Sequence, residues 1–440
     1  MLSLISASSP SGNDRRIKLL STDLIFGGIN NVFVYPSLDV DRLKDAISRT
    51  LSFWPIVTGR VIVENNEDYY IKFSDQSIPF TYAENDELDQ WPNLPVIIDD
   101  ENVLKPFIDS VQYKPEIEPL LRLKVTRLVR SNEYIFGVSF CHIMGDANSN
   151  LHFLNDLSQT YQQLEPSLPR PTFERHPLRT ENREFTSSSV LKLYQNVQKR
   201  ETVLARLTEE HSTTEPLNMS FSSEQIARLH HLASVNNSDV TPHDALCAYI
   251  ILLLNKHAFP TEDQCIRRVY MLINYRDVSE RLAGKNYVAN AIMQPLSEDF
   301  PDPYSLPSIA QTIRRLIKTA RQEEFLDNWV SSANALMKQF IQNGEINFTW
   351  DKDELIFNSN YKYDWTDQVH FGMNGQCRFH TAGLFKFYFR IFRLNPTVDH
   401  QGHWEKDQGG AEVAFRIPKG DMKEKFLQGW KEDVAKNFKR

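Results

Sequence analysis

The sequence predicts an α/β protein built as two domains. Segments rich in β-branched and aromatic residues alternate with amphipathic helical segments along the chain. The 440 residues exceed what one hydrophobic core usually holds. Residues 165–190 contain four prolines and then a Thr-Ser-Ser-Ser run, which is typical of a connection between domains. We therefore expect an N-terminal domain over residues 1–175, a crossover linker over 176–215 and a C-terminal domain over 216–440.

Composition and charge narrow the class of protein. With 41% hydrophobic, 11% aromatic and 24% charged residues, the chain is typical of a globular protein. Its net charge of −8 argues against a nucleic-acid binder, which needs a basic face. The apolar run 245–254 is about half of a membrane span, and the N-terminal apolar stretch is too short for a signal peptide. The cysteines are scattered and indicate neither a disulfide framework nor a metal knuckle: Cys141, Cys247, Cys265 and Cys377. We expect a cytoplasmic protein with no stable membrane insertion.

The first domain is expected to open with a helix over residues 40–51. Its apolar residues recur at helical spacing, and Asp39 can cap it. Residues 85–120 are acidic and proline-rich, so we expect them to run over the surface. Alternating apolar residues indicate the strand pairs of this domain, which are 57–63 with 69–73 and 120–129 with 133–140.

The stretch 139–148 holds the strongest candidate for chemistry. His142 stands where the strand 133–140 ends, and Asp146 follows just before a helix that runs to about residue 164. Strand ends of this kind present reactive side chains on a rigid scaffold. Histidine titrates near neutral pH, so His142 is a candidate general base. Asp146 can equally serve as the cap of the following helix.

The second domain is expected to alternate helices and strands in the same way. Thr241 is well placed to cap a helix that is apolar nearly all round and therefore buried. A strand over 268–275 delivers Arg276 at its end. The other expected helices are 191–206, one opening at Ser222, 309–342 and 420–437, and the other expected strands are 217–221, 384–389 and 411–417.

Several stretches, in this order along the chain, resemble one known family. Residues 38–60 contain an opening helix, then L-S-F-W-P and T-G-R, similar to an L-x-x-F-P-x-x-A-G-R signature. His142 and Asp146 form an H-x-x-x-D motif, and residues 241–246 read T-P-H-D-A-L. Together these stretches resemble the BAHD acyltransferases, plant and fungal enzymes that move acyl groups from coenzyme A thioesters to alcohols or amines.

Two later stretches complete the resemblance. The family carries a strand-end Arg and, fourteen residues on, the Asn of Y-x-G-N; here Arg276 and Asn290 have this spacing, with Tyr287 in place and Ala289 replacing the glycine. The family's D-F-G-W-G motif is degenerate here: it falls on His370, Phe371 and Gly372, of which Phe371 and Gly372 agree with the motif and His370 replaces its aspartate. The motif is mainly structural in the family, so these residues are expected to have a structural role.

The resemblance implies a chloramphenicol acetyltransferase-like fold, in which two similar domains of mixed β-sheet with flanking helices enclose an active-site channel. It implies an acyl-CoA-dependent O- or N-acyltransferase in which acyl-CoA is a co-substrate, no cofactor is bound permanently, and a small-molecule alcohol or amine is the acceptor. Members of the family are usually monomers, so the resemblance implies a monomer. The family's T-S-W falls on residues whose side chains would contact the oxyanion or the substrate, or else are loop polar groups: Ser359, Asn360 and Tyr361.

The resemblance assigns His142 as the general base. Asp146 has two readings: it orients the imidazole, as in a Ser-His-Asp triad, or it pairs with Arg276 and holds the loop in shape, as the family implies, and we favour the second. Cys141 could be read as a nucleophile, but neighbouring residues on a strand point to opposite faces, so a buried thiol is the better reading. The remaining histidines, such as His243, His400 and His403, lack a convincing third ligand, and no metal site is predicted.

Two other classes compete with this reading. Chloramphenicol acetyltransferases and the condensation domains of peptide synthetases share the fold but prefer H-H-x-x-x-D-G, whereas Cys141 precedes the histidine and Ala147 follows the aspartate here. The other alternative is a catalytically inactive BAHD-like protein that binds a ligand or a partner. The degenerate D-F-G-W-G supports that alternative, and the intact H-x-x-x-D opposes it.

Overall fold

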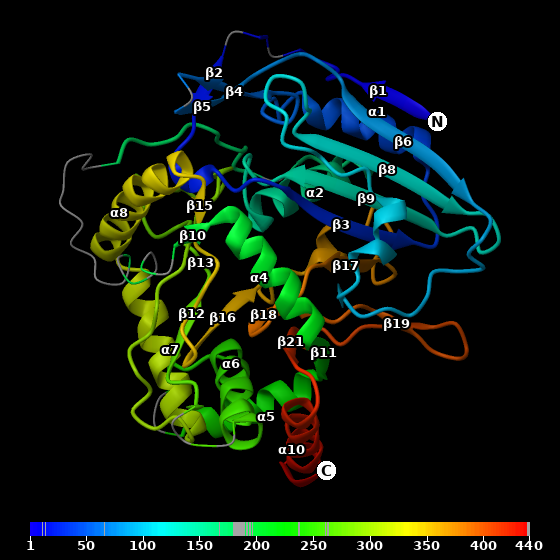
Figure 1. The fold of residues 1–440 in the computed structure, drawn as a ribbon. Helices are drawn as coiled ribbons and strands as arrows, with labels where there is room; N and C mark the ends of the chain where they lie inside the picture. The colour runs from blue at the N-terminus through cyan, green and yellow to red at the C-terminus, as the bar shows by residue number, and fades with distance from the viewer. Residues whose placement is uncertain are drawn as a thin grey trace.

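The computed structural model of this chain contains two mixed β-sheets, each flanked by helices (Figure 1). It describes residues 1–437 except positions 11, 14, 66, 167, 179–189, 191, 193, 194, 196, 236, 237, 260, 262 and 263. Within this described part, no helix is both long enough and apolar enough to cross a membrane.

The first sheet has seven strands in the order β1-β6-β8-β9-β3-β17-β7. The strands are β1 (Leu2–Ile5), β3 (Gly28–Tyr35), β6 (Ile78–Asn85), β7 (Ile97–Ile98), β8 (Leu121–Leu128), β9 (Tyr134–Cys141) and β17 (Arg378–Ala382). Helices α1 (Val40–Leu51) and α2 (Ala147–Tyr161) pack against each other, and they share one apolar core with the sheet. A small sheet lies beside it, made of β2 (Arg16–Lys18), β4 (Arg60–Glu64) and β5 (Asp68–Lys72). The predicted strand pairs β4–β5 and β8–β9 and the predicted cap of α1 by Asp39 are confirmed.

The second sheet has five strands in the order β11-β21-β18-β16-β12. The strands are β11 (Thr214–Phe221), β12 (Arg268–Met271), β16 (Glu354–Ser359), β18 (Tyr388–Arg393) and β21 (Ala411–Pro418). The helices of this half are α4 (Arg200–Thr213), α5 (Ser223–Ala233), α6 (Pro242–Leu253), α7 (Leu306–Ala320), α8 (Glu323–Gln342) and α10 (Asp421–Asn437). The predicted caps of α5 by Ser222 and of α6 by Thr241 are confirmed, and α6 is buried along almost its whole length.

Several short elements connect the larger ones. They are the helices η1 (Ser21–Asp23), η2 (Glu101–Val103), η3 (Lys105–Phe107), η4 (Leu254–Ala258) and α9 (Trp365–Gln368), and the two-residue strands β10 (Gln198–Lys199), β13 (Ile273–Asn274), β14 (Ile292–Met293), β15 (Glu345–Ile346), β19 (Thr397–Val398) and β20 (Trp404–Glu405). Of these, β13 and β14 pair with each other just before Arg276 and just after Asn290, which brings those two residues close together.

One strand lies in the opposite half from the sequence prediction. β17 falls within residues 216–440, but it pairs with β3 of the first sheet, so that Phe379 lies opposite Phe33. Trp365 and Phe371 also belong to the first core. A strand with two buried faces reads the same whichever sheet receives it, so local pattern does not choose its partner. The boundaries of the linker at 176 and 215 stay a prediction.

Three local predictions were wrong. The helix expected over 309–342 is two helices, α7 and α8, separated at Arg321 and Gln322. The strand expected over 384–389 begins only at Tyr388, because a turn with Phe387 at φ +52° precedes it. Residues 85–120 do not simply run over the surface: Trp91, Leu104 and Phe107 are among those that form a third apolar cluster. The expected helix 191–206 lies partly outside the described residues, which show α4 from Arg200 onward.

Candidate active site

A cavity of about 490 Å³ lies between the two sheets, which is within the usual size range of small-molecule sites. The first sheet contributes residues of β3 and β17 to its wall, the second contributes residues of β16 and β18, and the start of α2 closes one side. His142 and Asp146 line this cavity, so the predicted reactive stretch faces it.

The position of His142 is fixed by its neighbours on both sides. The residue follows β9, and its backbone N–H donates to the carbonyl of Gly27 at 2.9 Å. Its ring Nδ1 lies 3.1 Å from Oδ1 of Asn290. The amide nitrogen of Asn290 donates to the carbonyls of His142, at 2.7 Å, and of Asp23, at 2.9 Å. Those two acceptors fix which way the amide faces, so its oxygen must be the atom that meets the ring.

This arrangement selects one tautomer of the imidazole. Because Oδ1 of Asn290 only accepts hydrogen bonds, Nδ1 of His142 carries the proton and Nε2 keeps its lone pair. Burial lowers the pKa of His142, which favours the neutral ring. A neutral imidazole with a free Nε2 lone pair at a cavity wall can accept a proton from a bound hydroxyl or amine.

Asp23 and Arg175 support Asn290 from behind, and the sequence analysis did not identify either of them. The Asp23 carboxylate accepts the backbone N–H of Asn290 at 3.1 Å. Arg175 donates to the same carboxylate from Nε at 2.8 Å and from Nη2 at 3.2 Å, and both side chains are almost fully buried. The one sequence signal for Asp23 is an acidic residue that lies between two short apolar runs, 19–20 and 24–26.

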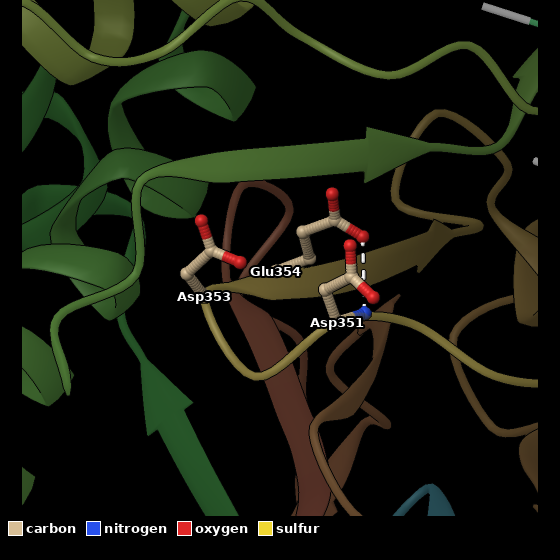
Figure 2. A group of neighbouring side chains, drawn as sticks. All are labelled: Asp351, Asp353 and Glu354. Atoms are coloured by element: carbon tan, nitrogen blue, oxygen red, sulfur yellow. Dashed lines mark hydrogen bonds between the residues drawn. The ribbon is translucent and has the colours of Figure 1, made fainter. Parts of the chain in front are cut away.

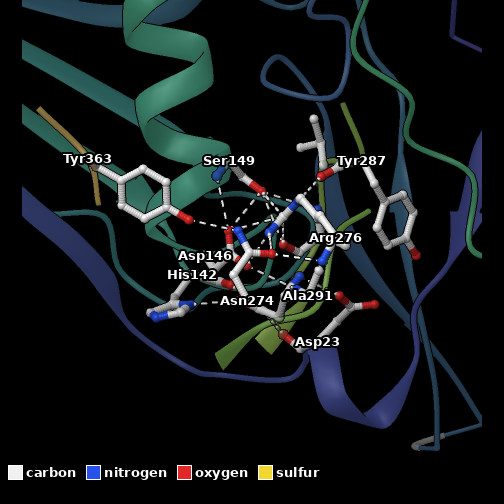
Figure 3. A network of polar contacts seen from close by, with 12 residues as sticks. Asp23, His142, Asp146, Ser149, Asn274, Arg276, Tyr287, Ala291 and Tyr363 are labelled. Carbon is white, nitrogen blue, oxygen red and sulfur yellow. Dashed lines mark hydrogen bonds and ion pairs between the residues drawn. The ribbon is translucent and has the colours of Figure 1, made fainter. Parts of the chain in front are cut away.

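Asp146 and Arg276 form a buried ion pair beside the histidine (Figure 3). Nη1 of Arg276 lies 2.9 Å from Oδ2 of Asp146, and Nη2 lies 3.1 Å from Oδ1, which is the bidentate geometry of a strong pair. Asp146 also accepts the backbone N–H of Ser149 at 3.0 Å, as the cap of α2, and that of Ala291 at 3.0 Å. The carboxylate therefore directs its hydrogen bonds to the loops around His142, whereas the imidazole bonds to Asn290.

Arg276 joins the loop 287–291 to the start of α2. Its Nε donates to the carbonyl of Tyr287 at 2.7 Å, and its Nη2 donates to that of Ala289 at 2.8 Å. The network uses the backbone of Ala289, so a methyl group in place of the family's glycine does not interrupt it. Gly145 has a steric reason to remain glycine, because a Cβ there would come within 2.5 Å of Ser149 Oγ.

The predicted T-S-W equivalents separate into two groups. Ser359 and Asn360 line the cavity, and Asn360 is held by its backbone N–H bond to Ile391, at 2.7 Å. Tyr361 turns away from it, in agreement with the alternative of a loop polar group: its hydroxyl donates to the carbonyl of Gly409 at 2.6 Å, and its ring stacks on His243. β16 ends at Ser359 and the chain turns at Tyr361, so Tyr361 does not follow the direction of the two residues before it.

Two polar residues of the cavity were not predicted from the sequence. Asn274 donates to the hydroxyl of Tyr363 at 2.7 Å, and both line the wall near His142. Oδ1 of Asn274 also accepts from Nη1 of Arg276 at 3.2 Å, so the cavity wall is joined to the buried ion pair. Only tertiary structure brings them together, since they come from distant parts of the chain.

The degenerate D-F-G-W-G segment lies in the first core. The ring of Phe371 is buried and packs against Tyr35, Phe136 and Tyr161 with centroid distances of 5.1–5.7 Å. The N–H of Gly372 donates to Nδ1 of His370 at 3.0 Å, and Gly372 has φ +87°, a conformation that favours glycine.

Cys141 is a buried thiol. Burial raises its pKa to about 11, so it is not in the thiolate form that a nucleophile needs. Its neighbour His142 lines the cavity, as expected if successive side chains at the end of a strand point in opposite directions.

One group of acidic side chains in the described residues has the spacing of a cation site: Asp351, Asp353 and Glu354 (Figure 2). Arg268 Nη2 lies 3.1 Å from Asp353 and 3.2 Å from Glu354, and Lys192 Nζ lies 2.8 Å from Glu354. Cations of the chain itself therefore neutralise this group.

The chain is similar to known transferases in sequence and fold. The model of the transferase family matches residues 3–424. A hydroxycinnamoyltransferase of Narcissus pseudonarcissus is 30% identical over 145 residues, which cover 32% of this chain and 32% of that relative, so the match spans about a third of its length.

Solved structures extend the comparison over nearly the whole chain. Vinorine synthase matches with a TM-score of 0.63 and 17% identity, over 98% of this chain and 97% of that one. TRI101 of F. graminearum, complexed with coenzyme A and deoxynivalenol, matches with a TM-score of 0.71 and 16% identity, over 96% and 98%. VibH, an NRPS condensation enzyme, matches with a TM-score of 0.52 and 14% identity, over 93% and 91%. The predicted two-domain α/β fold is confirmed.

Proposed function

The chain belongs to the transferase family of BAHD acyltransferases, and from this premise we propose that it transfers an acyl group from a coenzyme A thioester to the hydroxyl or amine of a small molecule. The observation that carries the proposal is the fixed, neutral imidazole of His142 on the wall of a cavity between the two sheets. Acyl-CoA enters as a co-substrate. The protein acts as a monomer in the cytoplasm.

The proposed reaction needs a base and donors for one oxyanion. Nε2 of His142 removes the proton of the acceptor as its oxygen or nitrogen attacks the thioester carbon. The tetrahedral oxyanion is stabilised by donors of the cavity wall, for which Asn360 and Ser359 are our candidates. The intermediate then expels the coenzyme A thiolate, and the imidazolium returns the proton to that sulfur. In this scheme Asp146 and Arg276 are positioning residues that hold the loop of His142.

The test begins with donor binding, because it needs no knowledge of the acceptor. Thermal unfolding is followed with acetyl-, malonyl-, medium-chain, long-chain and aromatic acyl-CoA, and a ligand at a hundred times its Kd adds about 2.7 kcal/mol of stability. The donor that shifts Tm is then used in an acceptor screen. His142→Ala should keep the shift and lose about 10²–10⁴-fold in kcat, while the exposed-loop control His400→Ala should keep both.

A variant His142→Ala that transfers as fast as the native chain would refute the assignment of the base. The second candidate function is a catalytically inactive ligand-binding protein, and the degenerate segment of His370, Phe371 and Gly372 is its support. That function predicts a thermal shift with a ligand but no transfer by the native chain.

A further inference from the structure

Arg390 presents a cationic side chain to the cavity from the middle of β18. Alternate residues of this strand, Tyr388, Arg390 and Phe392, line the cavity, whereas Phe389 and Ile391 between them are fully buried in the core. This is the alternation of a strand with one face on the core and one on the cavity. The guanidinium is therefore directed into the space that holds the proposed substrates.

The hydrogen bonds of Arg390 leave one edge of the guanidinium free. Nη1 donates to the carbonyls of Ala382 and Gly383, and Nη2 donates to Oγ1 of Thr381 at 3.3 Å. A guanidinium has five N–H donors, so these bonds use three. Among the described residues nothing accepts from the other two donors, the Nε–H and the second Nη2–H; Nε and Nη2 lie on one edge of the guanidinium, the edge with which an arginine can bind a carboxylate through two donors.

Arg390 also lacks a counter-ion within the described part of the chain. Three arginines with almost fully buried side chains each contact an aspartate: Arg175 contacts Asp23, Arg276 contacts Asp146 and Arg416 contacts Asp99. The guanidinium of Arg390 instead lies over the ring of Phe392, 5.3 Å from its centroid, and burial lowers its pKa. Arg390 is half-buried, so its charge is partly removed from water without a partner, and a bound anion would offset that desolvation cost.

The neighbouring Tyr388 adds a donor beside this edge. Asn358 lies directly opposite Arg390 in the parallel pairing of β16 with β18, and its Nδ2 donates to the hydroxyl of Tyr388 at 2.7 Å. The Tyr388 hydroxyl is the acceptor in that bond, so its own proton remains to be donated into the cavity. An anion at Arg390 would thus meet donors from two side chains of one strand.

We propose that Arg390, with Tyr388, binds a carboxylate carried by one of the substrates, so that this protein acts on acidic molecules. The inference rests on the proposed acyl transfer. The bound carboxylate would lie away from the reacting carbon. On β3, Gly28 pairs with Cys141, the neighbour of His142, whereas Asn31, three residues further along, pairs with Thr381, which contacts Arg390. Three residues of a strand span roughly 10 Å. Either an acceptor acid or the far carboxylate of a dicarboxylic acyl group has this chemistry.

The first experiment compares substrates on the native chain. The acceptors 4-hydroxybenzoate and 4-hydroxycinnamate are each tested against their methyl esters with acetyl-CoA, and succinyl-CoA is tested against butyryl-CoA with one neutral acceptor. We expect kcat/KM for the acid to exceed that of its neutral partner by about 10- to 100-fold in one of the two series. The acceptor series and the donor series identify which substrate carries the carboxylate.

The second experiment removes the guanidinium. Arg390→Gln should erase the preference for the acid by raising its KM, with little change for the neutral partner, and Arg390→Lys should restore only part of it, because a lysine lacks the two-donor edge. Lys386→Gln removes a nearby positive charge outside the cavity wall and should keep the preference. Tyr388→Phe provides a second test if Arg390→Gln does not fold, since its effect on the acid should also be selective.

Each outcome decides the inference separately from the proposed function. An active enzyme that treats acids and their neutral partners alike, or an Arg390→Gln variant that weakens both equally, would overturn the carboxylate site but not acyl transfer. If Arg390→Gln weakens coenzyme A binding and leaves 3′-dephospho-coenzyme A unaffected, Arg390 is a phosphate contact and the inference is wrong. If the native chain transfers no acyl group at all, the acid and ester probes are compared by thermal shift, where no preference again overturns the site.

Discussion

The buried pair of Asp146 and Arg276 allows its structural role to be separated from a catalytic one. Asp146→Asn keeps the shape of the side chain but replaces one carboxylate oxygen with an NH2 group. In the native protein both carboxylate oxygens accept hydrogen bonds. Oδ1 accepts from the N–H of Ser149 and from Nη2 of Arg276, and Oδ2 accepts from Nη1 of Arg276 and the N–H of Ala291. Whichever way the new amide turns, its NH2 group faces an N–H donor.

The magnitude follows from burial. The two side chains are 3% and 4% exposed, and breaking a buried ion pair by changing one partner costs about 3–5 kcal/mol. A domain of about 200 residues loses roughly 2–4 °C of Tm per kcal/mol, so a loss of about 3 kcal/mol lowers Tm by roughly 6–12 °C. The rate should fall as well, because the loop of His142 loses its anchor.

The assay is thermal unfolding combined with steady-state kinetics. Asp89→Asn is the matched control, because Asp89 pairs with Arg130 on the surface, where the side chains are 80% and 58% exposed, and such pairs contribute at most about 1 kcal/mol. The double variant Asp146→Asn/Arg276→Gln should be less destabilised than the sum of the two single variants. An Asp146→Asn protein with native Tm and greatly reduced kcat would refute this reasoning and favour a carboxylate that orients His142.

Further predictions concern residues around this pair. Asn290→Ala removes the acceptor that holds the proton on Nδ1 of His142, so kcat should fall about 10- to 100-fold while the KM for acyl-CoA is unchanged. A variant with a lowered Tm and weakened acyl-CoA binding as well would instead indicate general damage to the fold. Burial lowers the pKa of His380 to about 4, and its Nε2 accepts from Trp91, so protonation is disfavoured in the folded state. Stability contributed by this group is present above pH 6.5 and is lost as the pH falls toward 4, by about 2–3 kcal/mol. The unfolding free energy measured with urea at pH 7 and at pH 4.5 should therefore differ less for His380→Gln than for the native chain. An equal difference in the two proteins would contradict the lowered pKa of His380. Phe371→Ala should cost about 3–5 kcal/mol of unfolding free energy yet leave kcat near native well below Tm, and selective loss of kcat would show that the segment reaches the reacting atoms.

The sequence was most informative where the cause of structure is local. The helix at 40–51 with Asp39, the capped helix from Thr241 and the strand before His142 each carry their signal within a few residues, as apolar spacing and capping chemistry. The resemblance added the spacing of Arg276 and Asn290. The family, the two-domain fold and the cavity-facing place of His142 were all within reach of the sequence.

The tertiary structure decided which distant groups meet. No local pattern indicates that Asp23 and Arg175 support Asn290, that β17 joins the first sheet, or that Tyr361 turns away from the cavity. The same holds for Arg390, which in the sequence is one of two arginines in an otherwise apolar strand. A strand's side-chain period determines which residues share a face, but the partner of that face, and whether a charge on it finds a counter-ion, depends on long-range packing that a single sequence does not record.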